Sequence, residues 1–361
     1  MYRTLSFAFF VAFVCLLSAK KPAAEENVNR KWDSSVLKRD VAWYKSDEAH
    51  EIARNVVLHQ SIDGGWPKAV NLAVAPSQKR DRKDDSRGEL STFDNDATTL
   101  PLQFLARMVH VTGESSYETA FYRGFDYTLA AQYPNGGWPQ YFPLRKGYYS
   151  NITFNDNAMI RVMTLLRSAA SGKEPFEFVD ANRRELASAA VNRGIECILK
   201  TQIKQSGKLT AWCAQYDPVT LEPAWARAYE PPSLSGAESV GIVRFLIELE
   251  EPTPSVKASI EGAVTWLRSV AIHGVRYEEF QNERGKKDRR IVSDSSAEPL
   301  WARFYELETN RPIFLGRDSI VRYDIAEIDY ERRSGYGYYG DWPSGILAKN
   351  YPRWKQKHAP E

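Results

Sequence analysis

The chain has 361 residues, of which 43% are hydrophobic and 12% aromatic, so it can bury a large core as one big domain or two modest ones. The formal net charge of only +2 gives no electrostatic reason to expect a nucleic-acid partner. The histidines are scattered without zinc-site spacing, and there is no glycine-rich phosphate-binding loop, which argues against a zinc protein or a nucleotide-binding enzyme.

The chain begins with a pattern typical of an export signal. Arg3 precedes an apolar run over residues 7–17, and the small residues Ser18 and Ala19 follow it. The run is short for a membrane span, and no other stretch is long and apolar enough. We therefore expect residues 1–19 to be a signal peptide and the protein to be secreted or periplasmic, with no membrane attachment after cleavage.

Residues 20–45 are polar and are expected to form a flexible lead-in. Helical periodicity begins near Ser46, and the highly charged residues 77–89 predict a solvated loop. The range 96–110 predicts a helix in which Pro101 causes either a kink or a start near Thr99. Further helices are predicted over residues 116–132, 156–171, 180–202, 236–250 and 255–271.

Strand signals are sparse, and Ile291–Val292 in a short ribbon is the clearest. The range 301–343 is rich in aromatic and Arg residues, and the tail over 349–361 is expected to be loose. About seven helices in antiparallel pairs favour a mainly α fold, an α/α toroid with minor β elements and a loop-rich C-terminal part. We expect one catalytic domain over residues 46–348.

A turn containing tryptophan repeats along the chain. Gln60 and Gln132 are each followed by Gly-Gly-Trp-Pro turns that contain Trp66 and Trp138, and a degraded third copy has Trp212. The three tryptophans are spaced 72 and 74 residues apart by subtraction of their positions. Such a period indicates repeated supersecondary units, so the turns and the loops after them should gather at one end of the fold.

Two Asp/Asn segments follow the first two Trp turns, at Thr92–Thr98 and Thr153–Met159. Asp and Asn side chains often cap helices, because they accept hydrogen bonds from first-turn N–H groups. Clustered Asp and Asn oxygens also suit a hard cation, Ca²⁺ above all. Because the segment occurs twice in the same setting, we favour a cation site.

The third unit carries Arg227 in place of such a segment. An Arg near carboxylates is most often a structural ion pair, but small alanines flank this one and leave its approach open. Together the three units suggest an anionic, carboxylate-bearing substrate such as a uronic acid polymer, bridged by Ca²⁺. The two cysteines outside the signal, Cys197 and Cys213, fit either a disulfide or plain core positions.

The chain resembles a family 10 polysaccharide lyase, a pectate lyase with an (α/α)₃ toroid. The resemblance covers nearly the whole mature chain and rests on motifs in a fixed order. These are the Gly-Gly-Trp-Pro turns, Phe93-Asp94-Asn95, Phe154-Asn155-Asp156-Asn157-Ala158-Met159, Ala226-Arg227-Ala228-Tyr229-Glu230, Ser233-Leu234-Ser235-Gly236, Tyr330-Glu331-Arg332-Arg333-Ser334-Gly335-Tyr336 and Gly340-Asp341-Trp342-Pro343.

The resemblance implies a Ca²⁺-assisted β-elimination on de-esterified polygalacturonate, with Arg227 removing the C5 proton. Separately, we expect the protein to be a monomer. It implies a metal site formed by Asp94, Asn95 and Asp156. It also implies that substrate is bound by Arg303 and Arg317, while Tyr336 and Trp342 are either stacking platforms or core residues. The sequence leaves open endo or exo action, tolerated methyl esterification and the number of subsites.

Three alternatives remain at this point. The first is an α/α-barrel glycoside hydrolase with Asp94 and Asp156 as its acid and base, although the Asn-rich surroundings of both favour ionised ligands. The second is a non-catalytic uronan-binding protein that uses the same surface. The third, a terpenoid-cyclase-like toroid, suits the charged, Arg-bearing loops least.

Overall fold

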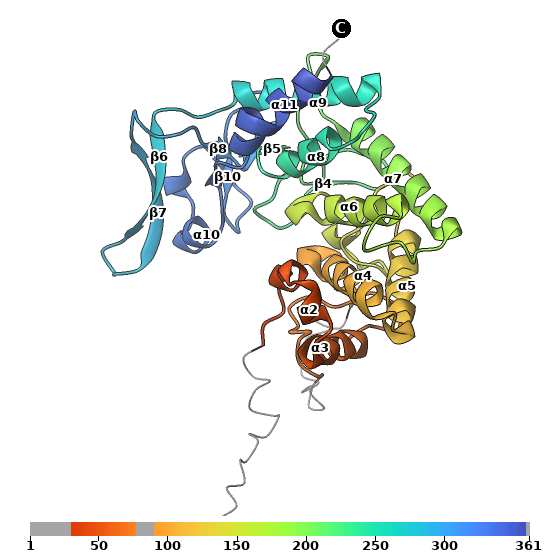
Figure 1. Ribbon diagram of the computed structural model, residues 1–361. Coiled ribbons are helices and arrows are strands. Elements are labelled where there is room, and N and C mark those ends of the chain that lie inside the picture. The colour runs from red at the N-terminus through yellow and green to blue at the C-terminus, as the bar shows by residue number, and fades with distance from the viewer. Residues whose placement is uncertain (1–29, 77–89, 359–361) are drawn as a thin grey trace, which may run out of the picture.

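The computed structural model describes residues 30–76 and 90–358, and within them the protein is mainly helical (Figure 1). Within this part of the chain, no helix has both the length and the apolar character needed to cross a membrane. The predicted signal peptide and the charged loop over 77–89 lie outside the described residues.

The helices pack as successive antiparallel pairs, α4 with α5, α6 with α7 and α8 with α9, arranged along an arc (Figure 1). This arrangement confirms the predicted α/α architecture. The helices are α2 (Val41–Tyr44), α3 (Asp47–Leu58), α4 (Thr99–Thr112), α5 (Ser115–Ala130), α6 (Ala158–Ser171), α7 (Ala181–Thr201), α8 (Glu238–Ile247), α9 (Pro254–Ser269), α10 (Tyr330–Gly335) and α11 (Tyr351–Lys357).

The strands form two-stranded antiparallel ribbons between and beyond the helices. Most are two residues long: β1 (Ile152–Thr153) with β4 (Gln215–Tyr216), β2 (Lys204–Gln205) with β3 (Lys208–Leu209), β5 (Leu234–Ser235) with β9 (Phe304–Tyr305), β8 (Trp301–Ala302) with β12 (Tyr339–Gly340), and β10 (Phe314–Leu315) with β11 (Val321–Arg322). The exception is the hairpin of β6 (Val275–Gln281) and β7 (Lys287–Ser293), which projects from the helical body (Figure 1). It contains the predicted strand Ile291–Val292.

The Trp turns anchor each helical unit through buried hydrogen bonds. Trp66, Trp138 and Trp212 are fully buried, and each indole N–H donates to a backbone carbonyl of the preceding helix at 2.8, 2.9 and 2.8 Å. A buried indole N–H needs such a partner, so the bond fixes how the turn sits on its helix. Trp301 repeats the contact with the carbonyl of Leu267 at 2.7 Å, a fourth copy that the sequence pattern did not reveal.

The glutamines before these turns tie neighbouring units together. The side-chain amide of Gln60 donates to the carbonyls of Gly64 at 2.7 Å and Ala120 at 2.8 Å. Gln132 and Gln202 repeat this double contact, each with one carbonyl of its own turn and one of a later helix. The repeat therefore specifies both the turn and the packing of successive helices.

Local chemistry explains where several helices begin. Ser46 and Asp180 cap α3 and α7 by accepting from the first-turn N–H groups of Ala49 and Arg183. Pro101 is the third residue of α4, within the first turn, where its missing N–H would have no helical partner. The alternative of a helix starting near Thr99 is therefore confirmed.

The folded part extends beyond the range that the sequence predicted. A short 3₁₀ helix, η2 (Ser34–Lys38), and α2 form within the expected flexible lead-in, and Trp32 packs edge-on against Phe104. The expectation of a loose tail from residue 349 is also wrong, because α11 buries Tyr351 and Trp354. Spacing of three residues puts both rings on one helix face.

The two cysteines are buried and free, so the structure decides for core positions and against a disulfide. Burial raises the pKa of the Cys197 thiol to about 12 and raises that of Cys213 as well. Both thiols are therefore protonated and unreactive at neutral pH.

Candidate active site

The two Asp/Asn segments share one backbone conformation. They form short 3₁₀ turns, η3 (Asp94–Asp96) and η5 (Asn155–Asn157), just before α4 and α6. The last two residues of each turn are left-handed, with φ of 48° and 63° in the first copy and 50° and 60° in the second. Asp and Asn tolerate this region better than other non-glycine residues, which explains their use here.

These side chains do not cap the helices that follow them. Neither turn shows a side-chain capping bond, nor does the residue that precedes either helix. The equivalent positions also match in exposure, because Asp94 and Asn155 are buried whereas Asn95 is exposed and Asp156 half-buried. The capping interpretation is therefore wrong for these segments, and their oxygens remain for another use.

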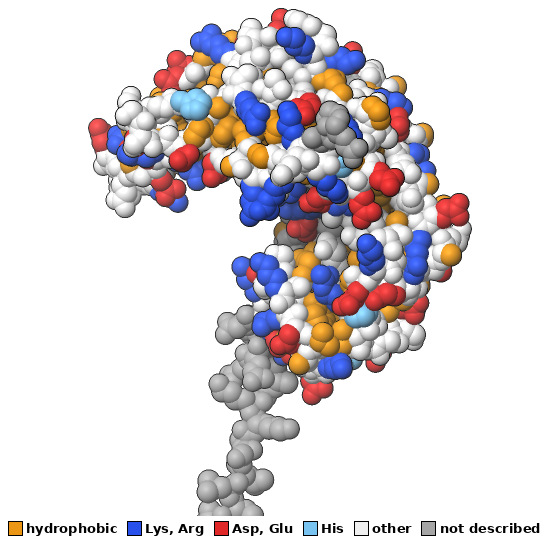
Figure 2. All heavy atoms as spheres, turned by 45° about the horizontal axis from the view of Figure 1, so that its top comes forward, with side chains coloured by type: hydrophobic (Ala, Val, Ile, Leu, Met, Phe, Trp, Pro, Cys, Tyr) orange, Lys and Arg blue, Asp and Glu red, His pale blue; other side chains and the backbone are white. Residues whose placement is uncertain are grey.

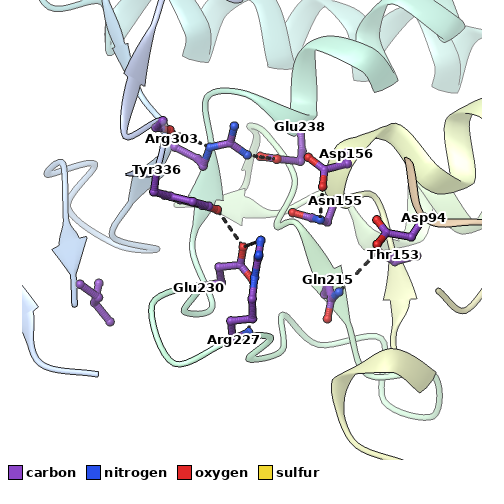
Figure 3. A network of polar contacts seen from close by, with 12 residues as sticks. Asp94, Thr153, Asn155, Asp156, Gln215, Arg227, Glu230, Glu238, Arg303 and Tyr336 are labelled. Atoms are coloured by element: carbon purple, nitrogen blue, oxygen red, sulfur yellow. Dashed lines mark hydrogen bonds and ion pairs between the residues drawn. The ribbon is translucent and has the colours of Figure 1, made fainter. Parts of the chain in front are cut away.

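The structure brings Asp94 and Asp156 to one region (Figure 3). Asn155 donates to the Asp156 carboxylate at 3.0 Å, and the Lys68 ammonium bonds to the buried Asp94 carboxylate. Burial lowers the pKa of Lys68, but the hydrogen bond and charge of Asp94 outweigh it and raise the pKa above its usual value. Asn95 faces a neighbouring hollow of about 360 Å³ that Lys68 also lines.

The neighbouring Asp96 points to a different partner. Its carboxylate pairs with the Arg161 guanidinium at 2.9 Å and accepts from the Thr99 hydroxyl at 3.2 Å. Burial raises the pKa of Asp96 despite the charge of Arg161. Asp96 therefore joins α4 to α6 as a structural pair.

Arg227 faces the Asp segments from the third unit but is held by Glu230 (Figure 3). Its Nε donates to Glu230 at 2.8 Å, and its Nη2 bonds to the other carboxylate oxygen. The Tyr336 hydroxyl donates to the same buried carboxylate at 2.8 Å. Burial lowers the pKa of Arg227, but the bonds and charge of Glu230 outweigh it and raise the pKa further above its ordinary value.

Arg303 links the units. Its Nε donates to the carbonyl of Gly337 at 2.9 Å, and its Nη1 pairs with the buried Glu238 at 2.5 Å. Burial lowers the pKa of Arg303, but negative charges around it, among them Glu238 and Asp156, raise it overall. Nη2 has no hydrogen-bond partner within residues 30–76 and 90–358, so it remains available to a ligand.

The two predicted stacking residues both lie against Arg303. Its guanidinium is 5.1 Å from the ring centre of Tyr336 and 5.3 Å from that of Trp342. Tyr336 also packs against Tyr229 and is fixed by its bond to Glu230. Trp342 lines a hollow of about 400 Å³ beside Arg303, together with Tyr277 and Tyr339 of the ribbons.

Arg317 lies at the edge of this group. Its side chain is 63% exposed and pairs with the exposed Glu331 at 3.0 Å. Its guanidinium is 5.8 Å from the ring of Tyr229, while Arg227 is 5.1 Å from the same ring. The structure therefore connects Arg317 to the other predicted residues indirectly, through Tyr229 and through Glu331 and Arg332, whose carbonyl accepts from the Tyr336 N–H.

The donor chemistry of the Asp94 and Asp156 region fits a calcium ion. Carboxylate and amide oxygens are the hard ligands that Ca²⁺ takes, and the charge of Lys68 already balances Asp94. Another group of possible ligands, His110, Glu174 and Glu177, is exposed on the outer surface of the helices. Figure 2 shows the molecule hollowed on one side, with Lys and Arg side chains gathered at the edge of the hollow.

The structure adds four residues to those that the sequence singled out. Lys68, Asn155, Glu230 and Glu238 complete the polar network around the predicted side chains. Asn155 and Glu230 lie inside motifs that were visible in the sequence, and Lys68 and Glu238 lie within two residues of such motifs. Glu230 could have been found from its spacing of three residues from Arg227. Glu238 could not, because its partner Arg303 lies 65 residues further along the chain.

Comparison with known proteins gives one family and related solved structures. The family model described as pectic acid lyase matches residues 60–347. A family 10 polysaccharide lyase from Cellvibrio cellulosa is 32% identical, with a TM-score of 0.75, over 91% of this chain and 98% of its own. An aspartate-to-alanine variant of such a lyase, in complex with trigalacturonic acid, matches with the same identity and TM-score over 92% and 100%. No curated protein sequence matches the chain significantly.

Proposed function

The chain belongs to the pectic acid lyase family and is a polysaccharide lyase, and from this premise we propose that it cleaves polygalacturonate by Ca²⁺-dependent β-elimination with Arg227 as the base. In this reaction the base removes the C5 proton and a C4–C5 double bond forms. The bond from C4 to the glycosidic oxygen breaks, and that oxygen leaves with the departing sugar and takes up a proton. No water is consumed, which separates the reaction from hydrolysis.

The side chains around Arg303 suit a uronate carboxylate. Its free Nη2 offers a charge-assisted hydrogen bond, and the Glu238 and Gly337 contacts fix the guanidinium in place beforehand. The C5 proton is acidic only because it lies next to the carboxylate, so a cation on that carboxylate stabilises the charge that develops as the proton leaves. We assign this role to Arg303, with Arg317 at the outer edge of the site.

Calcium, when bound, would add a second positive charge at the substrate carboxylate. We propose Asp94 and Asp156 as its protein ligands. Asn95, which lines the neighbouring hollow, would be the third ligand. Calcium and the Lys68 ammonium would then compete for the Asp94 carboxylate, so Lys68 would shift from Asp94 toward the substrate.

The pair with Glu230 holds the Arg227 guanidinium in place for its role as a base. In the described conformation its Nη1 makes no hydrogen bond and is the atom open to substrate, while Nε and Nη2 are held by Glu230. A neutral guanidine is populated only briefly at an ordinary pKa above about 12, so proximity to the C5 proton must supply much of the rate. Glu230 and Tyr336 position the guanidinium for that purpose.

The observation that carries the proposal is the convergence of Asp156, Arg303 and Arg227 from three different units on one region (Figure 3). The test is ultraviolet absorbance during incubation with polygalacturonate, with added CaCl₂ and again with a chelator. A lyase leaves an unsaturated, absorbing end group, and the absorbance should rise only with calcium. New reducing ends without absorbance would indicate a hydrolase, and binding without cleavage would indicate a uronan-binding protein.

We also propose that the enzyme acts after export, in the periplasm or outside the cell, as a monomer. The support is the apolar run before Ser18 and Ala19, together with a polymeric substrate. Determining the N-terminal residue of the mature protein by mass spectrometry tests export, since cleavage after Ala19 should leave Lys20 first.

A further inference from the structure

A cavity lies away from the candidate active site, between the β6–β7 hairpin and α10. Its volume is about 840 Å³, within the range of small-molecule and sugar sites. The hairpin projects from the helical body (Figure 1). None of the residues that the proposed reaction uses lines it.

The charged groups of this cavity are mainly cationic. Four basic side chains and two acidic ones line it: Arg284, Lys286, Arg290, Arg333, Glu283 and Asp288. Arg333 is neutralised by the buried Asp288 at 2.7 and 2.8 Å, and Arg290 pairs with Glu278 at 2.7 Å. Arg284 and Lys286 have no acidic partner and Glu283 has no basic one among the described residues, so the excess of positive charge at the hairpin tip is two charges less one.

The hairpin tip holds these two cations on an ordered backbone. The Asn282 side chain accepts from the N–H groups of Arg284 at 3.0 Å and Lys286 at 3.1 Å. Gly285, with a φ of 67°, supplies the left-handed residue that a hairpin loop of this length requires. Asn282 and Lys286 close the loop through a backbone bond of 2.8 Å. The loop is therefore formed before a ligand arrives.

Aromatic side chains complete the cavity. Phe280 on β6 and Tyr330 on α10 both line it, and Tyr330 is 37% exposed. The Arg290 guanidinium covers one face of Phe280 at 4.4 Å. Cations and aromatic rings that line one cavity are the groups that bind a sugar carboxylate and stack on a sugar ring.

We propose that this cavity is a second binding site for the substrate polymer, taking a de-esterified uronate stretch remote from the bond that is cut. The inference rests on the proposed function, because only a polymeric, anionic substrate can occupy both places. Its effect is avidity: a chain held at the hairpin raises the local concentration of uronate at the active site. A short oligomer cannot bridge the two places and gains nothing.

The kinetic test compares Arg284→Gln/Lys286→Gln with the wild type on polygalacturonate and on trigalacturonate. We expect KM for the polymer to rise about 5-fold or more, with kcat and all constants for the trimer unchanged. The matched control is Lys204→Gln/Lys208→Gln, which removes two exposed cations from another hairpin, β2–β3. An unchanged polymer KM, an equal rise in the control, or a loss on the trimer would each overturn the proposal.

A binding test without turnover separates this inference from the proposed function. In native gels that contain polygalacturonate and a chelator, the wild type and the control should be retarded, and Arg284→Gln/Lys286→Gln much less. Gels with fully methyl-esterified pectin should retard none of them. Equal retardation of all three proteins by polygalacturonate would contradict the site whether or not the enzyme proves to be a lyase.

Discussion

The first two helical units and the third share a scaffold but differ in the loops that it presents. All three bury a tryptophan whose indole N–H bonds to the preceding helix, and all three use a glutamine amide to join two carbonyls. The first two units then turn through left-handed Asp and Asn residues. The third instead carries Arg227, Glu230 and Glu238.

This difference teaches that the scaffold and the chemistry are specified separately. The buried Trp and Gln contacts fix where each loop emerges, whatever residues that loop contains. The first two loops supply oxygens that suit a cation, and the third supplies a guanidinium near the same region (Figure 3). Changes in the loops should therefore alter catalysis, and changes in the turns should alter stability.

The largest expected effect is on Arg227. Arg227→Ala should lower kcat by about 10²- to 10⁴-fold, the usual worth of a base, because no other described side chain takes its place beside Glu230. Steady-state kinetics on polygalacturonate measures this. Since the variant leaves the buried Glu230 unpaired, Arg227→Ala/Glu230→Gln serves as a folding control. Near wild-type turnover in either variant would remove Arg227 from the reaction.

Asp156→Ala should act on the metal. We expect the calcium concentration for half-maximal rate to rise at least about 10-fold, as losing even a supporting contact to a metal site does. The chain fold should be retained, because Asp156 is half-buried and bonds only to Asn155 among the described side chains. A calcium titration of the initial rate measures it. The same half-maximal concentration in variant and wild type would take Asp156 out of the metal site.

Glu230→Gln should shift the pH dependence. Glu230 raises the pKa of Arg227 against the opposing effect of burial, so the neutral amide should let that pKa fall. At any pH below the pKa of the base, a lower pKa leaves a larger fraction of the base unprotonated, so the alkaline rise in kcat should begin at a lower pH than in the wild type. Profiles of kcat against pH for both proteins test this. A rise displaced to higher pH would show that Glu230 does not raise the pKa of Arg227.

The smallest effect on catalysis is expected from the scaffold. Trp138→Phe and Trp212→Phe each leave a buried carbonyl, of Thr128 or Ile198, without its indole donor. Each should lower the free energy of unfolding by about 1–3 kcal/mol, with kcat unchanged. Urea denaturation and kinetics of both variants check this. A kcat loss in only one of them would mean that the turns differ in function after all.

Much of the fold could be predicted because its signals are local. The Gly-Gly-Trp-Pro turns, the caps at Ser46 and Asp180 and the helical periodicity all lie within a few residues of the structure they specify. The short C-terminal helix α11 escaped because only Tyr351 and Trp354 mark its buried face. Trp301 escaped because its turn lacks both the two glycines and the preceding glutamine, although it makes the same bond.

The site was predicted less completely for the same reason. Asp94, Asp156 and Arg227 stand in motifs whose composition points to chemistry. The partners that hold them come from elsewhere: Arg303 meets Glu238 across 65 residues, and Tyr336 meets Glu230 across 106. Spacing in the chain carries no trace of such contacts. The capping function that Asp and Asn usually have is local, yet here the left-handed backbone prevents it.

The division between the metal loops and the base is tested most directly by calorimetric titration of calcium into two variants that do not turn over, with trigalacturonate present. The proteins are Arg227→Ala and Arg227→Ala/Asp156→Ala. The account predicts that Arg227→Ala binds calcium when trigalacturonate is present and that Arg227→Ala/Asp156→Ala loses this binding. Equal calcium binding by both variants would contradict it, because Asp156 of the second unit would then not hold the metal.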